Sequence, residues 1–262
     1  MIKPTKFRWV VLAIIFITYT INYADRTNIG IALPFIQNEF HINNFEAGAI
    51  ASFFFLGYAI SQIPAGVALG KLGLRAIVSL SIIGFSLFTF LIGTASSASM
   101  LKWFRLGLGL CEGPTPVGLT TTINNWFPIK EKSTAVGVYI ASTMFAPIIV
   151  PTICVWIAMN LGWRWMFFLF AIPGVIMAIV WYFVIRTHPE ESSHVNEAEV
   201  EYIKNGKLVS DKKTDEFVSM GLLDRIIRIK EVVKLETNWQ VFKSGNLWGN
   251  TIAYFMMVSV LY

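Results

Sequence analysis

Residues 9–36, WVVLAIIFITYTINYADRTNIGIALPFI, decide the fold of this chain. The stretch is apolar and long enough to cross a lipid bilayer as a helix, which takes about 20 residues. Near its middle lie an acid and a base, Asp25 and Arg26. A charge at the bilayer centre costs about 2.5 to 3.5 kcal/mol on insertion scales, so such side chains usually pair with one another or line a watery cavity. The stretch therefore predicts a transmembrane helix that carries a polar site.

The composition of the whole chain is that of an integral membrane protein. Hydrophobic residues make up 55% of it and charged residues only 14%, whereas a soluble domain carries about 25% charged residues. The net charge is +5, but the sequence has no basic cluster with interleaved aromatic residues, so no nucleic-acid partner is expected. Cys111 and Cys154 lie in apolar segments and indicate neither a disulfide nor a metal site.

Apolar runs predict an all-α integral membrane fold with six complete spans and part of a seventh. The six predicted spans are residues 9–36, 47–70, 76–96, 101–126, 134–160 and 163–186. The seventh begins near Leu247 and is still incomplete at Tyr262, because too few residues remain for a comfortable crossing. The predicted domains are a six-helix bundle, a charged cytoplasmic central loop and the incomplete seventh helix, at residues 1–186, 187–245 and 246–262.

Within the central loop, residues 220–235 place apolar side chains on one helical face. This pattern predicts an amphipathic helix, which serves either as a docking element on the membrane or as an ordinary linker helix. The rest of the loop is rich in charges of both signs and predicts a solvated linker.

The lysines and arginines of the short loops set the predicted orientation, because cytoplasmic loops carry an excess of these residues. One side of the membrane carries seven of them and the other side only Lys102 and Arg164. The excess predicts that the N-terminus and the central loop lie in the cytoplasm. The seven basic residues on the predicted cytoplasmic side are Lys3, Lys6, Arg8, Lys71, Arg75, Lys130 and Lys132.

Four charged residues lie well inside the predicted spans: Asp25, Arg26, Arg105 and Glu112. Arg105 and Glu112 are seven residues apart, so they share one helical face and lie about 10 Å apart along its axis. The depths expected for Asp25 and Arg26 fall between these two. We therefore expect a cluster with crossed acid–base pairs if the first and fourth spans face each other. The alternatives are a permanent salt-bridge lock between helices and, for Arg105 alone, a side chain that reaches the membrane interface.

Arg26 belongs to a polar stripe on the first span. The stripe follows three- and four-residue steps and consists of Tyr19, Asn22, Tyr23, Arg26 and Gly30. A guanidinium flanked by tyrosines and an asparagine can hold a carboxylate through two parallel hydrogen bonds. A bound anion would weaken the hold of the arginine on a neighbouring carboxyl group, which could then take up a proton. The stripe thus predicts coupled movement of an anion and a proton, with the proton as coupling ion and no cofactor.

Glycine and proline mark the fourth span. Gly109 and Gly113 are four residues apart and permit a close approach of a neighbouring helix. Pro114 and Pro116 remove backbone hydrogen bonds beside Glu112. The glycines are no dinucleotide-binding fingerprint, because the third glycine of that motif is missing and no strand precedes them.

Three segments of the sequence resemble a known family. They are NYADRTNIGIALP at 22–34, RLGLGLCEGPTPVGLTTTINNWFP at 105–128 and THPEESSHVNEAEVEYI at 187–203. They resemble the first span, the fourth span and the central loop of the anion:cation symporter group of the major facilitator superfamily, which includes bacterial galactonate, glucarate and hexuronate carriers. The resemblance covers essentially the whole chain and corresponds to the N-terminal half of such a transporter. It implies that a C-terminal half is a missing partner.

The resemblance also implies roles for individual residues. Asp25 and Glu112 match carboxyl groups implicated in proton coupling, and Arg105 matches a member of the charge network. Together with the polar stripe, the resemblance implies a substrate site formed by Arg26, Asn22, Tyr23 and Tyr58. For Tyr58, packing in the core stays an equally good interpretation.

The loop between the second and third spans matches the gating loop of the superfamily in part. The matching residues are Gly66, Lys71, Gly73 and Arg75. Gly70 and Leu74 stand where that motif has an aspartate and an arginine, so the latch that the aspartate forms in relatives lacks its carboxylate here. Thr143 stands near the place where some relatives carry a glutamine for sugar-acid hydroxyls, which indicates a different substrate contact.

The expected function is import of a small organic anion, a sugar acid, by proton symport across the bacterial inner (plasma) membrane. The expected partners are the anion and the lipid bilayer. Two alternatives stay open: a non-transporting membrane fragment or binding and assembly module, and an importer of a different organic or inorganic anion, with sodium as another coupling ion. An enzyme is not expected, because the sequence lacks paired histidines, metal-ligand spacing and a nucleophile motif.

Overall fold

The computed structural model describes residues 3–213, 247–249, 251–253 and 256. The chain divides into two units, residues 1–213 and 214–262. In the second unit, residues 247–249, 251–253 and 256 are helical, within the segment predicted as the seventh span. The predicted amphipathic helix at 220–235 lies outside the described residues.

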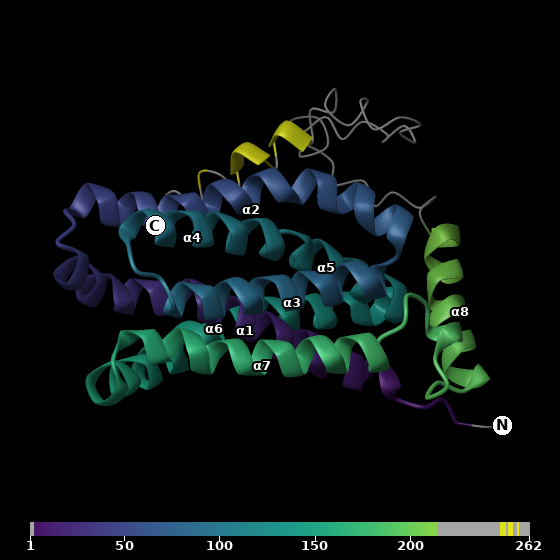
Figure 1. The fold of residues 1–262 in the computed structure, drawn as a ribbon. Coiled ribbons are helices and arrows are strands. Elements are labelled where there is room, and N and C mark those ends of the chain that lie inside the picture. Colours follow the sequence, from purple (N-terminus) through teal and green to yellow (C-terminus); the bar gives the residue numbers. More distant parts are fainter. Residues whose placement is uncertain (1–2, 214–246, 250, 254–255, 257–262) are drawn as a thin grey trace. The chain divides into compact units, whose positions relative to one another are not determined.

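The first unit is a bundle of long helices that run side by side (Figure 1). Its membrane-length helices are α1 (Phe7–Phe40), α2 (Asn44–Leu72), α3 (Leu74–Gly93), α6 (Ile129–Leu161) and α7 (Trp163–Val184). Within the described part of the chain, these five helices are long and apolar enough to cross a membrane. The predicted all-α membrane fold is therefore confirmed.

The fourth predicted span is divided into two shorter helices, α4 (Ala98–Glu112) and α5 (Pro114–Trp126). Gly113 between them keeps helical torsion angles, φ −56° and ψ −35°, so α5 follows directly on α4. The cause of the division is local, because Pro114 and Pro116 have no N–H to donate to the preceding turn. The predicted span 101–126 is therefore made of two helices, and it is interrupted beside the prolines that were predicted to remove backbone hydrogen bonds.

A neighbouring helix supports the backbone at this interruption. Ser81 of α3 donates its hydroxyl hydrogen bond to the carbonyl oxygen of Cys111, and its Oγ lies 2.7 Å from Oγ1 of Thr115. Inside a membrane, backbone groups freed by proline need such partners, because there is no bulk water to replace the lost bonds. Ser81 of α3 thus stabilises the backbone at the point where the helix divides beside Glu112.

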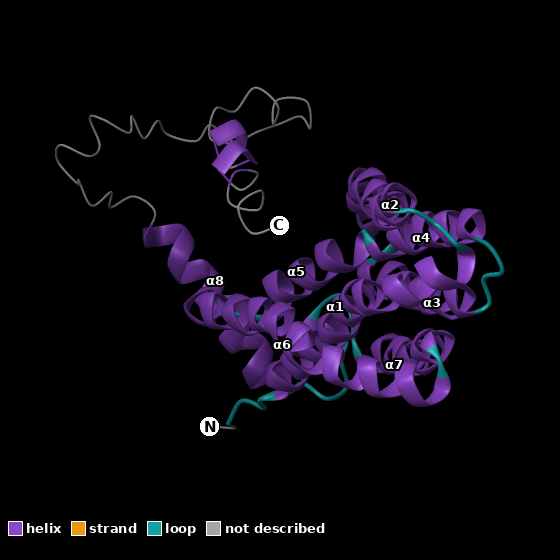
Figure 2. Ribbon diagram, turned by 90° about the vertical axis from the view of Figure 1, so that its left-hand side faces the viewer, coloured by secondary structure: helices purple, strands orange, loops and turns teal. Residues whose placement is uncertain are grey.

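The most extensive helix contacts join α2 with α4, α3 with α7 and α1 with α6 (Figure 2). This pattern has an internal symmetry. If the first three spans are matched in order with the last three, the α1–α6 contact becomes the α4–α2 contact and the α3–α7 contact maps onto itself. Three-plus-three repeats of this kind are common in secondary transporters.

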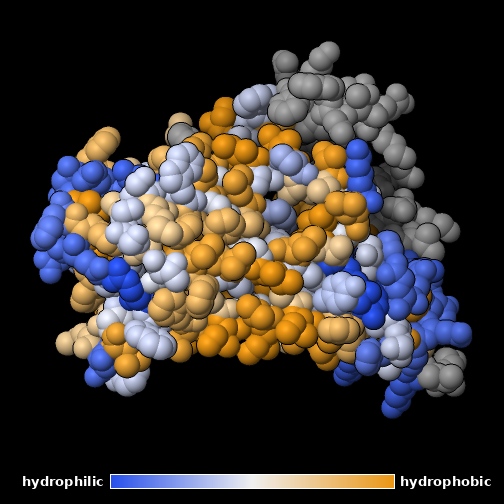
Figure 3. Space-filling view, in the orientation of Figure 1, coloured by the Kyte–Doolittle hydropathy of each residue, from blue (hydrophilic) through white to orange (hydrophobic). Residues whose placement is uncertain are grey.

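The bundle has an apolar outer surface and buries a few charged side chains within an apolar core. On the face shown in Figure 3, hydrophobic side chains cover the middle of the molecule and hydrophilic ones gather at both ends. Large apolar side chains are exposed, such as Ile63 at 77% and Ile148 at 72%. Conversely, Asp25, Arg105 and Glu112 are fully buried. This distribution fits a bundle whose outer surface faces lipid.

A helix that the solvated-linker prediction missed follows α7. After a short 3-10 turn, η1 (Pro189–Glu191), α8 (Glu197–Lys213) lies at the end of the bundle near the N-terminus (Figure 1). Asn196 is the N-cap of α8, because the Oδ1 atom of Asn196 accepts a hydrogen bond of 2.9 Å from the backbone N–H of Glu199. The prediction of a solvated linker outside residues 220–235 did not include this helix.

Charged contacts fix α8 to the bundle. The carboxylate of Glu199 is fully buried and accepts from the backbone N–H groups of Phe7 and Arg8, at 3.2 and 3.3 Å, so it caps the start of α1. Arg8 donates to Glu199 at 2.8 Å and to Glu131 of α6 at 2.7 Å. The hydroxyl of Tyr202 donates to Glu131 at 3.0 Å, and this hydrogen bond raises the pKa of the Tyr202 phenol.

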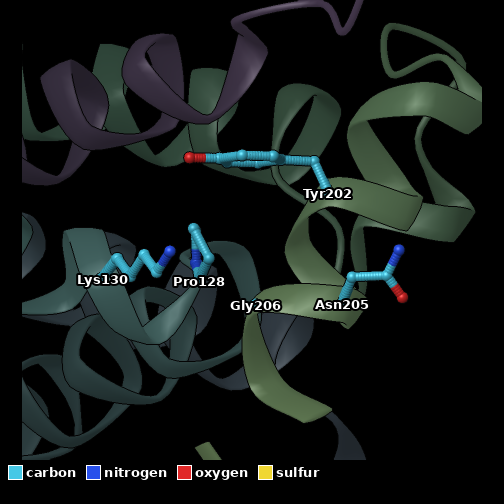
Figure 4. Close-up of a pocket in the computed structure, with 5 residues that line it drawn as sticks. All are labelled: Pro128, Lys130, Tyr202, Asn205 and Gly206. Carbon is cyan, nitrogen blue, oxygen red and sulfur yellow. The ribbon is translucent and has the colours of Figure 1, made fainter. Parts of the chain in front are cut away.

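Beside these contacts, α8 and the start of α6 enclose a pocket of about 270 Å³ (Figure 4). Tyr202, Asn205 and Gly206 line it from α8, and Pro128 and Lys130 face them. Gly206 lets α8 approach Pro128 closely, because a side chain at this position would collide with the proline ring. The pocket marks where α8 docks on the bundle.

Candidate functional site

Arg26 of α1 and Glu112 at the end of α4 form an ion pair inside the bundle. Nε and Nη2 of Arg26 donate to the same oxygen, Oε2 of Glu112, at 3.1 and 3.0 Å. The Glu112 side chain is completely buried, whereas the Arg26 side chain keeps 17% of its surface exposed. One of the predicted crossed acid–base pairs is therefore confirmed.

Aromatic rings surround the guanidinium of Arg26. Its central carbon lies 4.7 Å from the ring centre of Tyr23, 4.5 Å from that of Tyr58 and 5.3 Å from that of Phe54. Asn22 accepts from Nη2 of Arg26 at 3.4 Å. The structure thus brings together the four residues predicted for the substrate site. Such rings hold a cation by their π-faces and leave the edge of its fork available for an anion.

Asp25 points away from Arg26 and toward α3. Its Oδ2 accepts from the hydroxyl of Thr89 at 2.9 Å, and its Oδ1 accepts from the amide of Asn28 at 3.3 Å. The carboxyl group is buried among these neutral partners. Asp25 and Glu112 therefore occupy different environments, one bound by neutral donors and the other by an arginine.

Arg105 does not form the second predicted acid–base pair. Its Nη1 donates to the backbone carbonyl oxygen of Asp25 at 3.4 Å, and its central carbon lies 4.6 Å from the ring centre of Phe54. The side chain is buried, so the alternative of an arginine at the membrane interface is wrong. The four-residue salt-bridge lock is also wrong, because within the described part of the chain Arg26–Glu112 is the only ion pair among these four residues. Arg105 does not pair with the carboxylate of Asp25 because the hydroxyl of Thr89 and the amide of Asn28 already donate to its two oxygens.

Several buried polar atoms on α1 and α4 have no hydrogen-bond partner among the residues that the structure describes. They include Nδ2 of Asn22, Nε of Arg105, Oε1 of Glu112, Oγ1 of Thr18 and Oδ1 of Asn28. Buried polar groups are normally satisfied, and each orphan costs about 1 to 3 kcal/mol. Three of these atoms belong to Asn22, Arg105 and Glu112, which lie at or beside the Arg26–Glu112 pair.

Glycines set the distance between the helices that carry the site. A Cβ at Gly109 of α4 would collide with the backbone carbonyl of Phe54, and one at Gly57 of α2 would collide with the carbonyl of Leu106. The predicted close approach at Gly109 is confirmed. Phe54 can reach both Arg26 and Arg105 because α2 and α4 lie this close together.

The predicted gating loop lies at the end of the bundle where α2 meets α3. Gly73 has φ +82° and ψ 151°, a conformation that only glycine adopts readily. The helix α2 contains Gly66 and Lys71, and Lys71 is exposed. Arg75 points to α7, where its Nε donates to the carbonyl oxygen of Tyr182. The gating role of these residues stays a prediction.

Three site residues were missed in the sequence. Thr89 lies in an apolar run, where its isolated hydroxyl group was the one sequence feature that could have indicated a polar contact. Phe54 reads as an ordinary core residue. Tyr139 of α6 stacks on Tyr19 at 4.5 Å between ring centres and extends the aromatic wall. Thr143, by contrast, donates to the carbonyl of Ile140 in its own helix at 2.7 Å.

The described residues include no group of three or more His, Cys, Asp or Glu side chains that could hold a metal ion. Cys111 and Cys154 are free thiols. Within the described residues, the candidate site contains one partly exposed guanidinium, Arg26, and two buried carboxyl groups, Asp25 and Glu112.

Comparisons with known proteins show the family of the chain. Residues 15–262 match the family described as Major Facilitator Superfamily. The chain is 32% identical over 210 residues to the probable galactarate/D-glucarate transporter GudP of Bacillus subtilis (strain 168), covering 78% of this chain and 46% of the relative. It is 29% identical over 263 residues to the D-galactonate transporter of Escherichia coli O6:H1, covering 99% of this chain and 58% of the relative. The chain thus spans about half the length of the curated relatives it matches.

Solved structures show the same fold. The inward-open xylose transporter XylE from E. coli superposes with a TM-score of 0.66 at 13% identity, covering 84% of this chain and 59% of that one. A bacterial homologue of the human lysosomal transporter Spinster gives a TM-score of 0.62 at 24% identity, covering 70% of this chain and 45% of that one. At these identities the likeness concerns the fold alone.

Proposed function

Because the chain belongs to the Major Facilitator Superfamily, we propose that it forms half of a transporter that carries a small organic anion, a sugar acid, by proton symport. The chain is a multi-pass membrane protein. Its relatives are named as transporters of galactarate, D-glucarate and D-galactonate, which supports the substrate class. The inner membrane as location and the cytoplasm as the side of the N-terminus belong to the same proposal.

The observation that carries the proposal is the ion pair between Arg26 and Glu112. Arg26 is partly exposed, and its fork is held by a single carboxylate oxygen. The carboxylate of a sugar acid has the same charge and shape as that of Glu112, so it can compete for the same guanidinium. Arg26 is then the residue that recognises the substrate anion.

The same competition supplies a route for the proton. When an anion takes Arg26, Glu112 is left as a buried charge without its partner, which costs several kcal/mol. Taking up a proton removes this cost, so anion and proton bind together. Asp25 is a second buried carboxyl group on the same helix as Arg26 and is proposed to exchange a proton in the same cycle.

Binding to the purified chain tests the recognition step. Galactonate, glucarate and glucuronate are titrated against the wild type, Arg26→Ala and Arg164→Ala, which removes an exposed arginine of another ion pair, with Glu39. Arg26→Ala is expected to abolish binding, and Arg164→Ala to retain it. Equal binding by Arg26→Ala and wild type would refute the proposed role of Arg26.

Uptake into vesicles with an imposed pH gradient, by this chain as part of the full-length transporter, tests the coupling. Asp25→Asn and Glu112→Gln are expected to impair gradient-driven accumulation while anion binding is retained. Normal accumulation in both variants would refute proton coupling. A chain that binds sugar acids without accumulating them would instead be a binding or assembly module, and accumulation of other anions alone would assign a different substrate.

A further inference from the structure

Two arginines from different helices converge on one backbone oxygen at the end of the bundle that holds the N-terminus. Nε of Arg75, in the first turn of α3, donates to the carbonyl oxygen of Tyr182 on α7. Nη1 of Arg186, just after α7, donates to the same oxygen at 3.3 Å. The guanidinium of Arg75 also stacks on the Tyr182 ring, 4.0 Å from its centre. Two positive charges are thus held next to each other.

Both arginines donate to a carbonyl oxygen in the last turn of α7. Nη1 of Arg186 also donates to the carbonyl oxygens of Phe183 and Ile185, at 3.0 and 3.3 Å, as a basic residue at a helix C-terminus commonly does. Arg75 reaches this C-terminus from the start of another helix, so the cap brings two guanidinium groups together. In the described part of the chain, neither arginine forms an ion pair with a carboxylate. Adjacent guanidinium groups repel each other, so an anion between them would stabilise the arrangement.

An apolar groove begins directly beside these arginines. It lies between α3 and α7, has a volume of about 380 Å³ and offers no polar surface. Ala76 and Ala178 leave it hollow, while Leu80, Ile83, Ile179 and Phe183 form its walls. Leu80 and Phe183 are each 64% exposed on the outside of the bundle. Tyr182 belongs both to the groove and to the arginine pair, so the two features are continuous.

We propose that this groove and the arginine pair bind one anionic phospholipid, with an acyl chain in the groove and the phosphate on Arg75 and Arg186. Guanidinium groups bind phosphate oxygens through paired, charge-assisted hydrogen bonds. Basic pockets between transmembrane helices are suited to anionic headgroups. The combination fixes the class of ligand, because a soluble phosphate does not use the groove and a zwitterionic lipid gains less from two positive charges.

The test measures lipid binding to the purified, delipidated full chain by native mass spectrometry. Phosphatidylglycerol and phosphatidylcholine with the same acyl chains are compared. We expect phosphatidylglycerol to bind at least about tenfold more tightly, and Arg75→Ala/Arg186→Ala to abolish this preference. Lys130→Ala/Lys132→Ala is the matched control, because it removes two positive charges from the same end of the bundle outside the groove.

Further variants separate the two parts of the site. Ala76→Phe fills the groove and leaves both arginines in place, so it is expected to weaken binding of phosphatidylglycerol. Equal binding of the two lipids, or an equal loss in the lysine control, would overturn the proposal. Displacement of the lipid by equimolar glycerol 3-phosphate would also overturn it, because the site would then be one for a soluble phosphate. Helical circular dichroism of each variant verifies that it is folded.

Discussion

Glu112→Gln is the sharpest test of how anion and proton binding are joined. The change keeps the size of the side chain but removes the charge that competes with a substrate anion for Arg26. Glu112 accepts two hydrogen bonds from Arg26, at 3.0 and 3.1 Å, and a hydrogen bond to a charged group contributes about 1.5 to 3 kcal/mol. At about 1.4 kcal/mol per tenfold change in affinity, releasing Arg26 should strengthen anion binding about tenfold or more at alkaline pH.

The pH dependence gives the second half of this prediction. In the wild type, anion binding frees Glu112 to take up a proton, so binding should weaken as pH rises. In Glu112→Gln no proton is needed at this position, so the affinity should change little with pH. Calorimetry of galactonate binding in two buffers of different ionisation enthalpy measures the protons taken up per anion, and the value should fall by about one in the variant.

Glu39→Gln is the matched control, because Glu39 also pairs with an arginine, Arg164, but at a more exposed position. It should leave both the affinity and the proton uptake unchanged. The reasoning is refuted if Glu112→Gln binds galactonate more weakly at alkaline pH, or if it takes up as many protons as the wild type.

Three further predictions concern the supports of the site. Glu199→Ala should release α8 and raise hydrogen exchange there and in the first turn of α1, whereas the exposed Glu201→Ala should not. Gly109→Ala should lower the melting temperature in detergent, because its Cβ meets the backbone of α2, while Gly48→Ala, with open space around it, should not. Thr89→Val should impair gradient-driven uptake and Thr89→Ser should preserve it; equal uptake in both would deny the hydroxyl any role.

The membrane spans were predictable because their signal is local. Each span is a run of apolar residues, and the structure extends the predicted ends of α1 and α2 by a few residues. At the start of α2 the extension has a clear cause: Asn43 and Glu46 exchange hydrogen bonds of 2.9 and 3.2 Å between side chain and backbone. The loss of backbone hydrogen bonds at Pro114 was also predictable from the sequence, but the division of the span into two helices was not.

The partners of buried charges were harder to predict. The pairing of Arg26 with Glu112 followed from helix register and depth only on the condition that the first and fourth spans face each other. The hydrogen bond between Asp25 and Thr89 did not, because it joins α1 to α3, and nothing in the sequence indicates which helix faces which. For the same reason the docking of α8 was missed: Glu199 reads as a solvated acid until Phe7 and Arg8 are seen beside it.

The cap that Glu199 places on α1 has a mechanical consequence. Arg8 and Arg26 lie on the same helix, about 27 Å apart along its axis at 1.5 Å per residue, so this helix acts as a lever. A tilt of about 5° at Arg26 would carry its first turn sideways by about 2 Å. Hydrogen bonds of about 3 Å do not stretch that far, so α8 must travel with α1. A spectroscopic label on α8 would therefore report, outside the bilayer, on movements that begin at Arg26.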